Sequence, residues 1–191
     1  MKNLLYIILL TGFSAFAQGK KIEQEDRISG EKMPEAAMQL INSEKPDNAR
    51  RLKFYFETDG ETTSYEAKFK FKGHDYSVEF NNNGILEDIE VELKKKNLPE
   101  AALQKIKSFI EENNERHKIE KIQAQYLPAL SEIKAFAYAK NIQQNVPQNY
   151  ELIVAVKNDG KLQRFEMLFD NSGNFIEKRE VIRNEYDYLL F

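Results

Sequence analysis

The sequence predicts an α+β fold of two tandem units, each a helix followed by a four-stranded antiparallel sheet, with the helices packed on one face of the sheet. The motif Pro-Glu-Ala-Ala occurs at 34–37 and again at 99–102, both times within an apolar stripe of helical spacing. Alternating apolar and charged residues follow each copy, and matching turns lie at 80–84 and 169–173. Such internal repetition indicates a duplicated structural unit.

The first predicted helix begins at Pro34, because proline is favoured in the first turn of a helix, and ends before Pro46. Its apolar residues form a single stripe at helical spacing, namely Met33, Ala36, Ala37, Leu40 and Ile41. The second predicted helix begins at Pro99 and runs to about Asn114.

Eight strands are predicted from runs in which apolar and polar residues alternate, because successive side chains of a strand point to opposite faces. Four follow the first helix, at 52–56, 65–71, 76–80 and 85–91. Four follow the second, at 119–126, 150–157, 162–169 and 175–182. Strict alternation predicts that helices cover one face of the sheet and water the other. Whether the two sheets join edge to edge stays open.

The predicted boundaries are 18–32 for a flexible leader with a short strand at its end, 33–93 and 97–182 for the two units, and 183–191 for a tail. The second unit is longer than the first, and the additional sequence lies near 127–148. Within it, residues 133–139 fit a helix and a strand equally well.

Residues 1–17 have the features of a secretory signal peptide. Lys2 precedes an apolar run, and the small residues Ala15 and Ala17 precede Gln18, so cleavage is predicted between Ala17 and Gln18. The alternative, an uncleaved anchor, is weaker because a membrane-spanning helix needs about 20 apolar residues. The mature chain is expected in the periplasm or outside the cell, with no membrane span.

Composition excludes several classes of function. The chain has no cysteine, so it forms no disulfide and offers no thiolate for a metal or for catalysis. Its formal charge of −3, or −4 once Lys2 is removed, gives no basic excess for nucleic acid. His74 and His117 lie outside any metal-ligand spacing. We therefore expect no cofactor, no metal and no nucleic-acid partner.

Acidic residues are numerous, but their pattern is that of a solvated sheet face. In one predicted strand four acids surround two apolar residues: Glu87, Asp88, Glu90 and Glu92, with Ile89 and Val91. A hydrolase with an acid pair would need an apolar pocket that raises the pKa of one carboxyl group, and nothing in the sequence marks such a pocket. No nucleophile elbow or phosphate loop is present either. We therefore expect a protein that is not an enzyme.

Three aromatic residues are candidate partner-binding residues, because exposed aromatic side chains are enriched at protein interfaces. Tyr55 falls on the polar side of its predicted strand, and Phe136 and Tyr138 lie in the 127–148 segment. The ordinary alternative is that these side chains cover the ends of the core.

Residues 34–41, 65–91, 99–110 and 165–181 resemble the PepSY-like domains of bacterial exported proteins. The arrangement is also similar to the fold of the beta-lactamase inhibitor protein, which has two tandem helix-plus-sheet units. The resemblance implies this fold and a non-catalytic role. It does not extend to an inhibitory loop, and the 127–148 segment departs from the pattern.

Together these observations predict an exported, non-catalytic protein-binding or inhibitor-like module that uses the open sheet face and the 127–148 segment. Its expected partner is another exported or envelope protein. Two alternatives remain: an envelope hydrolase with an acid pair between the units, and a structural envelope protein without a tight ligand.

Overall fold

The structure, a computed structural model, describes residues 20–182. The predicted signal peptide, its cleavage site and the predicted tail at 183–191 lie outside these residues and stay predictions. Over residues 20–182 the fold is α+β, with three α-helices and one ten-stranded, mostly antiparallel sheet.

All eight predicted strands and both predicted helices are present, within a few residues of the predicted bounds. The helices are α1 (Glu35–Glu44), α2 (Glu100–Asn113) and α3 (Glu132–Ala139). The strands are β1 (Lys20–Lys21), β2 (Glu23–Ile28), β3 (Arg50–Asp59), β4 (Thr62–Phe71), β5 (His74–Phe80), β6 (Leu86–Glu92), β7 (Arg116–Tyr126), β8 (Asn149–Asn158), β9 (Lys161–Asp170) and β10 (Phe175–Val181).

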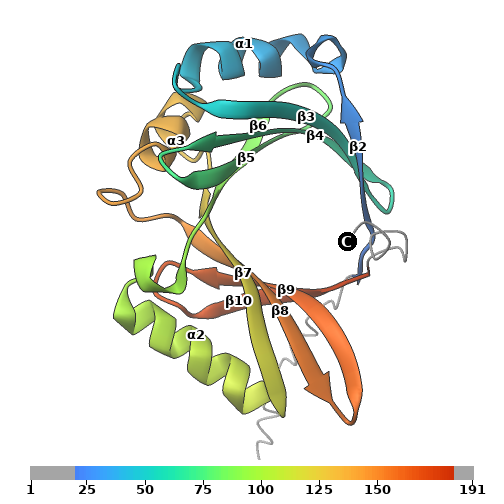
Figure 1. The fold of residues 1–191 in the computed structure, drawn as a ribbon, viewed down its shortest axis with the longest axis vertical. Coiled ribbons are helices and arrows are strands. Elements are labelled where there is room, and N and C mark those ends of the chain that lie inside the picture. Colours follow the sequence, from blue (N-terminus) through green and yellow to red (C-terminus); the bar gives the residue numbers. More distant parts are fainter. Residues whose placement is uncertain (1–19, 183–191) are drawn as a thin grey trace, which may run out of the picture.

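The sheet returns on itself. Its strand order is β1-β10-β9-β8-β7-β6-β5-β4-β3-β2, and β6 pairs antiparallel with β7, so the strands that follow α1 and α2 belong to one sheet. The two ends of this order, β1 and β2, are separated in the chain only by Ile22. The strands therefore form a ring, and the three helices lie outside it (Figure 1).

In the segment 18–32, predicted as a flexible leader with a short strand at its end, residues 20–28 form two strands, so the paired part is longer than predicted. β1 pairs parallel with β10 and β2 pairs antiparallel with β3, so this segment joins the two ends of the sheet. The Ile182 amide donates to the Lys21 oxygen at 2.9 Å, and the Ile22 amide donates to Asp59 Oδ1 at 2.8 Å. The segment has few apolar residues, so its order comes from backbone hydrogen bonds that its composition does not reveal.

The core lies between the outer face of the sheet and the helices. Ala37 and Ile41 of α1 are fully buried, as are Ile106 and Ile110 of α2. Phe80 and Phe169 each end an alternating apolar face, a pattern that points their side chains toward the helices. Both have no exposed surface and belong to this core. The ring of Phe169 meets Phe109 of α2 edge to face, with 5.6 Å between ring centroids.

The undecided segment at 133–139 is helical. Ser131 caps the start of α3 by accepting a hydrogen bond from the Lys134 amide at 3.2 Å. Ala135 and Ala139 are buried, and the Tyr76 hydroxyl donates to the Ala139 oxygen at 3.0 Å. α3 thereby ties β5 to the outer side of the ring.

Two turns have the same local structure. Asn81 Oδ1 accepts from the Ile85 amide at 3.1 Å, and Asp170 Oδ1 accepts from the Asn174 amide at 2.8 Å. Each turn ends on a glycine with positive φ, Gly84 at 76° and Gly173 at 83°. A side chain at Gly84 would collide with the backbone of Ala37 and the ring of Pro34, and one at Gly173 would collide with the backbone of Ala102. Glycine thus lets each turn contact the start of a helix.

We expect Gly173→Ala to be strongly destabilising, because it combines strain at positive φ with a collision. The added Cβ would meet the Ala102 oxygen and lie 2.9 Å from the Ala102 Cα. Positive φ in a non-glycine residue costs about 1–3 kcal/mol, and overpacking a further 1–3 kcal/mol or so. Urea unfolding measures the sum.

Gly160→Ala is the matched control, since Gly160 also has positive φ (76°) but no atom within 4 Å of an added Cβ. It should show the backbone strain alone. Equal losses of stability in the two variants would contradict the close contact between this turn and α2.

Candidate functional site

The inner face of the ring gathers carboxylates. Side chains alternate across a sheet, so the residues between those of the core point inward. Cross-strand pairing places Glu66 opposite Glu79, Glu79 opposite Asp88, and Glu166 opposite Arg179. We call eight of these residues the inner acid cluster: Glu57, Asp59, Glu66, Glu79, Asp88, Glu90, Glu151 and Glu166.

The predicted solvated acid face is therefore corrected at two of its four positions. Asp88 is only 9% exposed and Glu90 only 6%, whereas Glu87 and Glu92 are exposed as predicted. The reason is ring closure. In a flat sheet water would cover this face, but in a ring each strand faces the strands opposite.

At one end of the cluster, Lys68 lies among three carboxylates. Its Nζ is 2.7 Å from Glu25 Oε1, 2.7 Å from Glu66 Oε2 and 3.9 Å from Glu57 Oε1. It also lies 4.9 Å from the ring centroid of Tyr55. Burial raises the pKa of Glu66, but the hydrogen bond with Glu57 and the charge of Lys68 outweigh it and hold the pKa below its usual value. This group remains ionised.

The oxygens of Glu25, Glu57 and Glu66 lie within 4.8 Å of one another, a spacing that suits a metal ion. The ammonium of Lys68 already lies between them, however, and it offsets one of their charges at the place where a metal would lie. The cation at this place is a lysine of the chain itself.

We call the place where residues 20–28 join β10 and β3 the seam of the ring. There Glu166 forms ion pairs with two cations. Lys21 Nζ lies 2.6 Å from Glu166 Oε2 and Arg179 Nη2 lies 2.5 Å from Glu166 Oε1. Arg179 Nη1 also reaches Asp59 Oδ2 of β3 at 3.2 Å. Burial raises the pKa of Glu166, but Lys21 and Arg179 outweigh it and the pKa is lowered. These ion pairs join β1, β9 and β10 to β3 across the seam.

Within the described chain, the carboxylates in the middle of the cluster lack ion pairs of this kind to offset the cost of their burial. Among residues 20–182, no salt bridge reaches Glu79, Asp88, Glu90 or Glu151. Gln125 donates to Asp88 Oδ2 at 2.8 Å, and Gln123 donates to Glu90. Asp88 Oδ1 is buried without a hydrogen-bond partner in the described part of the chain.

Burial, together with the negative charge of neighbouring carboxylates, raises the pKa of these four groups. The pKa of Asp88 rises to about 6 and that of Glu151 to about 7. Glu79 and Glu90 are shifted well above the usual range. Like charges in a site of low polarity disfavour ionisation, so part of this group is protonated near neutral pH.

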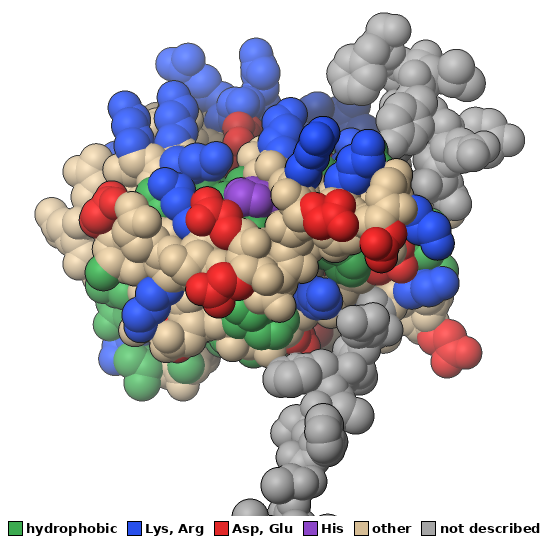
Figure 2. Space-filling model, turned by 90° about the horizontal axis from the view of Figure 1, so that it is seen from below, with side chains coloured by type: hydrophobic (Ala, Val, Ile, Leu, Met, Phe, Trp, Pro, Cys, Tyr) green, Lys and Arg blue, Asp and Glu red, His purple; other side chains and the backbone are tan. Residues whose placement is uncertain are grey.

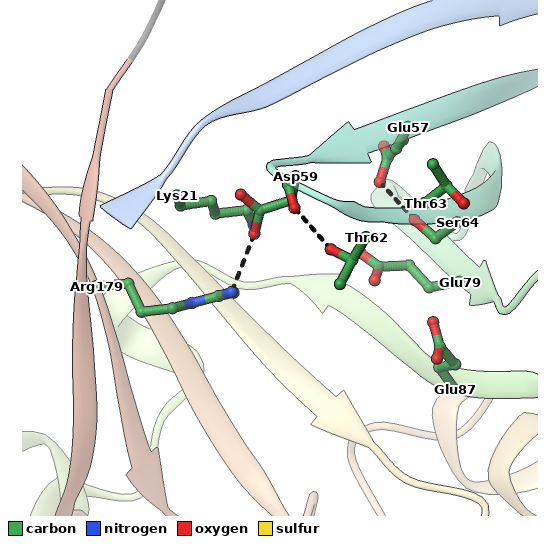
Figure 3. A pocket seen from close by; sticks show the side chains of 9 residues that line it. All are labelled: Lys21, Glu57, Asp59, Thr62, Thr63, Ser64, Glu79, Glu87 and Arg179. Carbon is green, nitrogen blue, oxygen red and sulfur yellow. Dashed lines mark hydrogen bonds and ion pairs between the residues drawn. The ribbon is translucent and has the colours of Figure 1, made fainter. Parts of the chain in front are cut away.

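A pocket of about 290 Å³ opens beside this group, between the seam and strands β3 to β6. Figure 3 shows the carboxylates of Glu79 and Glu87 on one side of it and the Arg179–Asp59 ion pair on the other. The residues that line it are Lys21, Glu57, Asp59, Thr62, Thr63, Ser64, Glu79, Glu87 and Arg179.

The three candidate partner-binding residues do not meet at one place. Tyr55 is half-buried and lies on the inner face, opposite Glu66 in the neighbouring strand. Phe136 is 1% exposed and packs in the core, so it is not available to a partner in this conformation. Tyr138 lies on α3, half-buried against the core on the outer side of the ring.

Sequence reasoning missed the inner acid cluster, although a signal was present. Acids occupy the polar positions of consecutive predicted strands, as in Glu66, Glu79, Asp88, Glu151 and Glu166. Aligning these strands in register would have placed the acids in adjacent rows. Their burial would still have been hidden, because it depends on ring closure.

No protein-family model and no curated protein sequence matches the chain. Solved structures do match. A DUF2874 family protein from Bacteroides ovatus ATCC 8483 is 13% identical, with a TM-score of 0.53, over 78% of this chain and 87% of that chain. A structure described as putative periplasmic proteins, from Bacteroides eggerthii DSM 20697, is 13% identical, with a TM-score of 0.52, over 78% and 88%.

A BLIP-like protein from Bacteroides fragilis NCTC 9343 is 19% identical, with a TM-score of 0.48, over 78% of this chain and 86% of that chain. The likeness to the first two structures concerns the fold alone. The PepSY-like relationship stays a prediction. Among residues 20–182, no helix has the length and apolar character needed to cross a membrane.

The raised pKa values predict that stability falls as pH rises from about 4 to about 7. Between their usual values of 3.8 and 4.5 and their folded values of about 6 and about 7, Asp88 and Glu151 bind more protons in the folded than in the unfolded protein. Raising the pH through this window therefore lowers the free energy of unfolding. Urea unfolding at pH 5 and pH 7.5 measures the fall.

Glu151→Gln removes one of these groups and should reduce the fall between the two pH values. Glu111→Gln, at an exposed position of α2, is the control and should leave it unchanged. A wild-type protein that gains stability from pH 5 to 7.5 would contradict the prediction.

Proposed function

We propose that this protein is an exported, non-catalytic module that binds a protein partner at the inner face of its sheet. The observation that carries the proposal is the middle of the inner acid cluster. Burying carboxylates without salt bridges costs folding free energy. Shifted pKa values of this kind are more frequent at functional sites than elsewhere. A chain that retains such a group beside an open pocket, with Glu79 among the lining residues, is best explained by a ligand that binds at this side of the cluster.

Charge indicates the chemistry of the partner. The inner acid cluster and its three salt-bridged cations, Lys21, Lys68 and Arg179, have a formal charge of −5, against −3 for the whole chain. The rest of the chain is therefore net positive, and Figure 2 shows many lysine and arginine side chains on the outer surface. Complementarity favours a partner that presents basic side chains to the inner face.

The proposed location is the periplasm or the outside of the cell. The signal-peptide pattern at 1–17 supports export. The fold is shared with a structure described as putative periplasmic proteins, which is consistent with this location. The proposed partner is accordingly another exported or envelope protein.

We also infer that the chain consists of two tandem units, 33–93 and 97–182. The repeated turns support this, as does a repeated contact at the helix starts: Gln39 donates to Glu35 at 3.1 Å, and Gln104 donates to Glu100 at 2.6 Å. In this interpretation β6 and β7 join the units, and each unit supplies about half of the inner face.

Two further surfaces belong to the proposal. Tyr55 contributes an aromatic ring on the inner face beside Lys68. The 127–148 segment presents three large apolar side chains to solvent: Leu130, Ile133 and Val146 are 70%, 60% and 64% exposed. Isolated exposed apolar residues are ordinary, so these residues serve as a second contact area only if the partner extends beyond the inner face.

Capture from an envelope extract tests the proposal, with the mature protein immobilised. The wild type should retain a stoichiometric partner. Glu87→Lys, an exposed substitution at the pocket, should lose most of it because a basic partner would be repelled. Glu111→Lys, on the outer surface of α2, makes the same charge change and should retain it. Equal retention by all three proteins, or no partner at all, would contradict binding at the inner face; the latter result would favour the structural alternative.

One observation favours the hydrolase alternative. Glu90 of β6 and Glu151 of β8, from the two proposed units, are hydrogen-bonded to one another and both have raised pKa values. This is the acid pair that such an enzyme would need. Neither residue lines the pocket, however, and Glu90 is 6% exposed, so a substrate in the pocket does not contact the pair.

We expect no turnover of fluorogenic glycoside, ester and peptide substrates between pH 5 and pH 8. Glu90→Gln and Glu151→Gln are the informative variants. Hydrolysis by the wild type that both variants abolish, while their folding is retained, would establish the enzyme and overturn the non-catalytic proposal.

A further inference from the structure

We propose that the pocket beside the seam binds the primary ammonium group of an aliphatic amine, and that this group lies between Glu79 and Glu87. The inference rests on the proposed function, since a lysine side chain of the protein partner would be the source of the ammonium. It names the chemistry by which the inner face would recognise that partner.

The first argument is the charge balance of the pocket. Four of its lining residues are acids, and two are bases. Arg179 is paired with Asp59 at 3.2 Å, Lys21 with Glu166 at 2.6 Å, and Glu57 lies 3.9 Å from Lys68. Within residues 20–182, the carboxylates of Glu79 and Glu87 form neither a salt bridge nor a side-chain hydrogen bond. The pocket therefore holds two acids that no cation of the described residues neutralises by direct contact.

The second argument is an acceptor that the described residues leave unused. Glu79 is directly opposite Asp88 in the pairing of β5 with β6, so its side chain lies on the inner face, and it lines the pocket. Glu79 is partly buried, and a carboxylate held away from water without a donor is destabilising. A donor supplied by a ligand in the pocket would remove that cost.

The third argument is a precedent on the same face. Lys68 shows how this sheet holds an ammonium: two carboxylate oxygens lie 2.7 Å from Nζ, and the ring of Tyr55 lies 4.9 Å from it. Glu66, one of these carboxylates, is the cross-strand neighbour of Glu79. The same cross-strand row therefore continues from Glu66 to Glu79, a further carboxylate acceptor that forms no salt bridge within residues 20–182.

Size favours an organic cation over a metal ion. The pocket's volume of about 290 Å³ is close to the lower limit for small-molecule sites, about 300 Å³. In the described residues, the group of three acids with metal spacing is Glu25, Glu57 and Glu66, which already holds Lys68. The hydroxyls of Thr62, Thr63 and Ser64 line the pocket and add neutral hydrogen-bonding groups beside the carboxylates.

Calorimetric titration of the mature protein at pH 7.5 and low salt tests the inference, with 1,5-diaminopentane, a tripeptide with a central lysine, and calcium chloride as separate probes. We expect both amines to bind. The tripeptide should bind more tightly than the diamine if a protein side chain is the natural source, and the reverse order indicates a free amine. Binding of calcium alone would overturn the assignment.

Glu79→Gln and Glu87→Gln should each weaken amine binding about tenfold or more, because each removes one charge-assisted hydrogen bond. Glu111→Gln on α2 is the matched control and should bind like the wild type. Thermal melting establishes that each variant folds; Glu87 is exposed, so Glu87→Gln decides the question even if Glu79→Gln unfolds. Unchanged affinity in Glu87→Gln, or no amine binding by the wild type, would overturn the inference.

The amine titration and the partner capture can fail independently. If the amines do not bind but the partner is still captured, only the assignment of the pocket is overturned. Amine binding without a captured partner would instead keep the pocket and remove the protein-binding function.

Discussion

The structure depends on the pairing of residues 20–28 with both ends of one sheet. β1 continues the sheet beyond β10, and β2 continues it beyond β3, with a single residue between them. The Arg179–Asp59 ion pair and the bond from the Ile22 amide to Asp59 reinforce the same junction. This pairing covers the free edge of β3 and the last residues of β10, which an open sheet would expose. It also turns one face of the sheet inward.

Ring closure creates the electrostatic character of the molecule. On an open sheet the polar face would be solvated, and its acids would have ordinary pKa values. Inside the ring, Glu66 and Glu166 form ion pairs with cations and stay ionised. In the described part of the chain, Asp88 and Glu151 have no ion pair and are held partly protonated. The fold therefore bears a cost near neutral pH that the apolar core on the outer face must offset.

That cost distinguishes the interpretations of the inner face. For a purely structural protein the cost of burying the acids serves no purpose, since apolar residues of similar size in their place would stabilise the ring. For a hydrolase, the pair formed by Glu90 and Glu151 has suitable pKa values but does not line the pocket. For a binding module, the acids Glu79 and Glu87, unpaired within the described residues, line the pocket, where a basic ligand can reach them. The last interpretation uses the most features of the site.

The sequence by itself determined the elements of the fold. Period-two alternation and the Asn-Gly and Asp-Gly turns located the strands, and the repeated Pro-Glu-Ala-Ala motif located α1 and α2, because these signals are local. The orientation of Phe80 and Phe169 followed from the same alternation. Only the tertiary structure decided that residues 20–28 close the sheet, that Phe136 is core and that Asp88 and Glu90 are buried. Each of these depends on contacts between residues far apart in the chain, which no local pattern records.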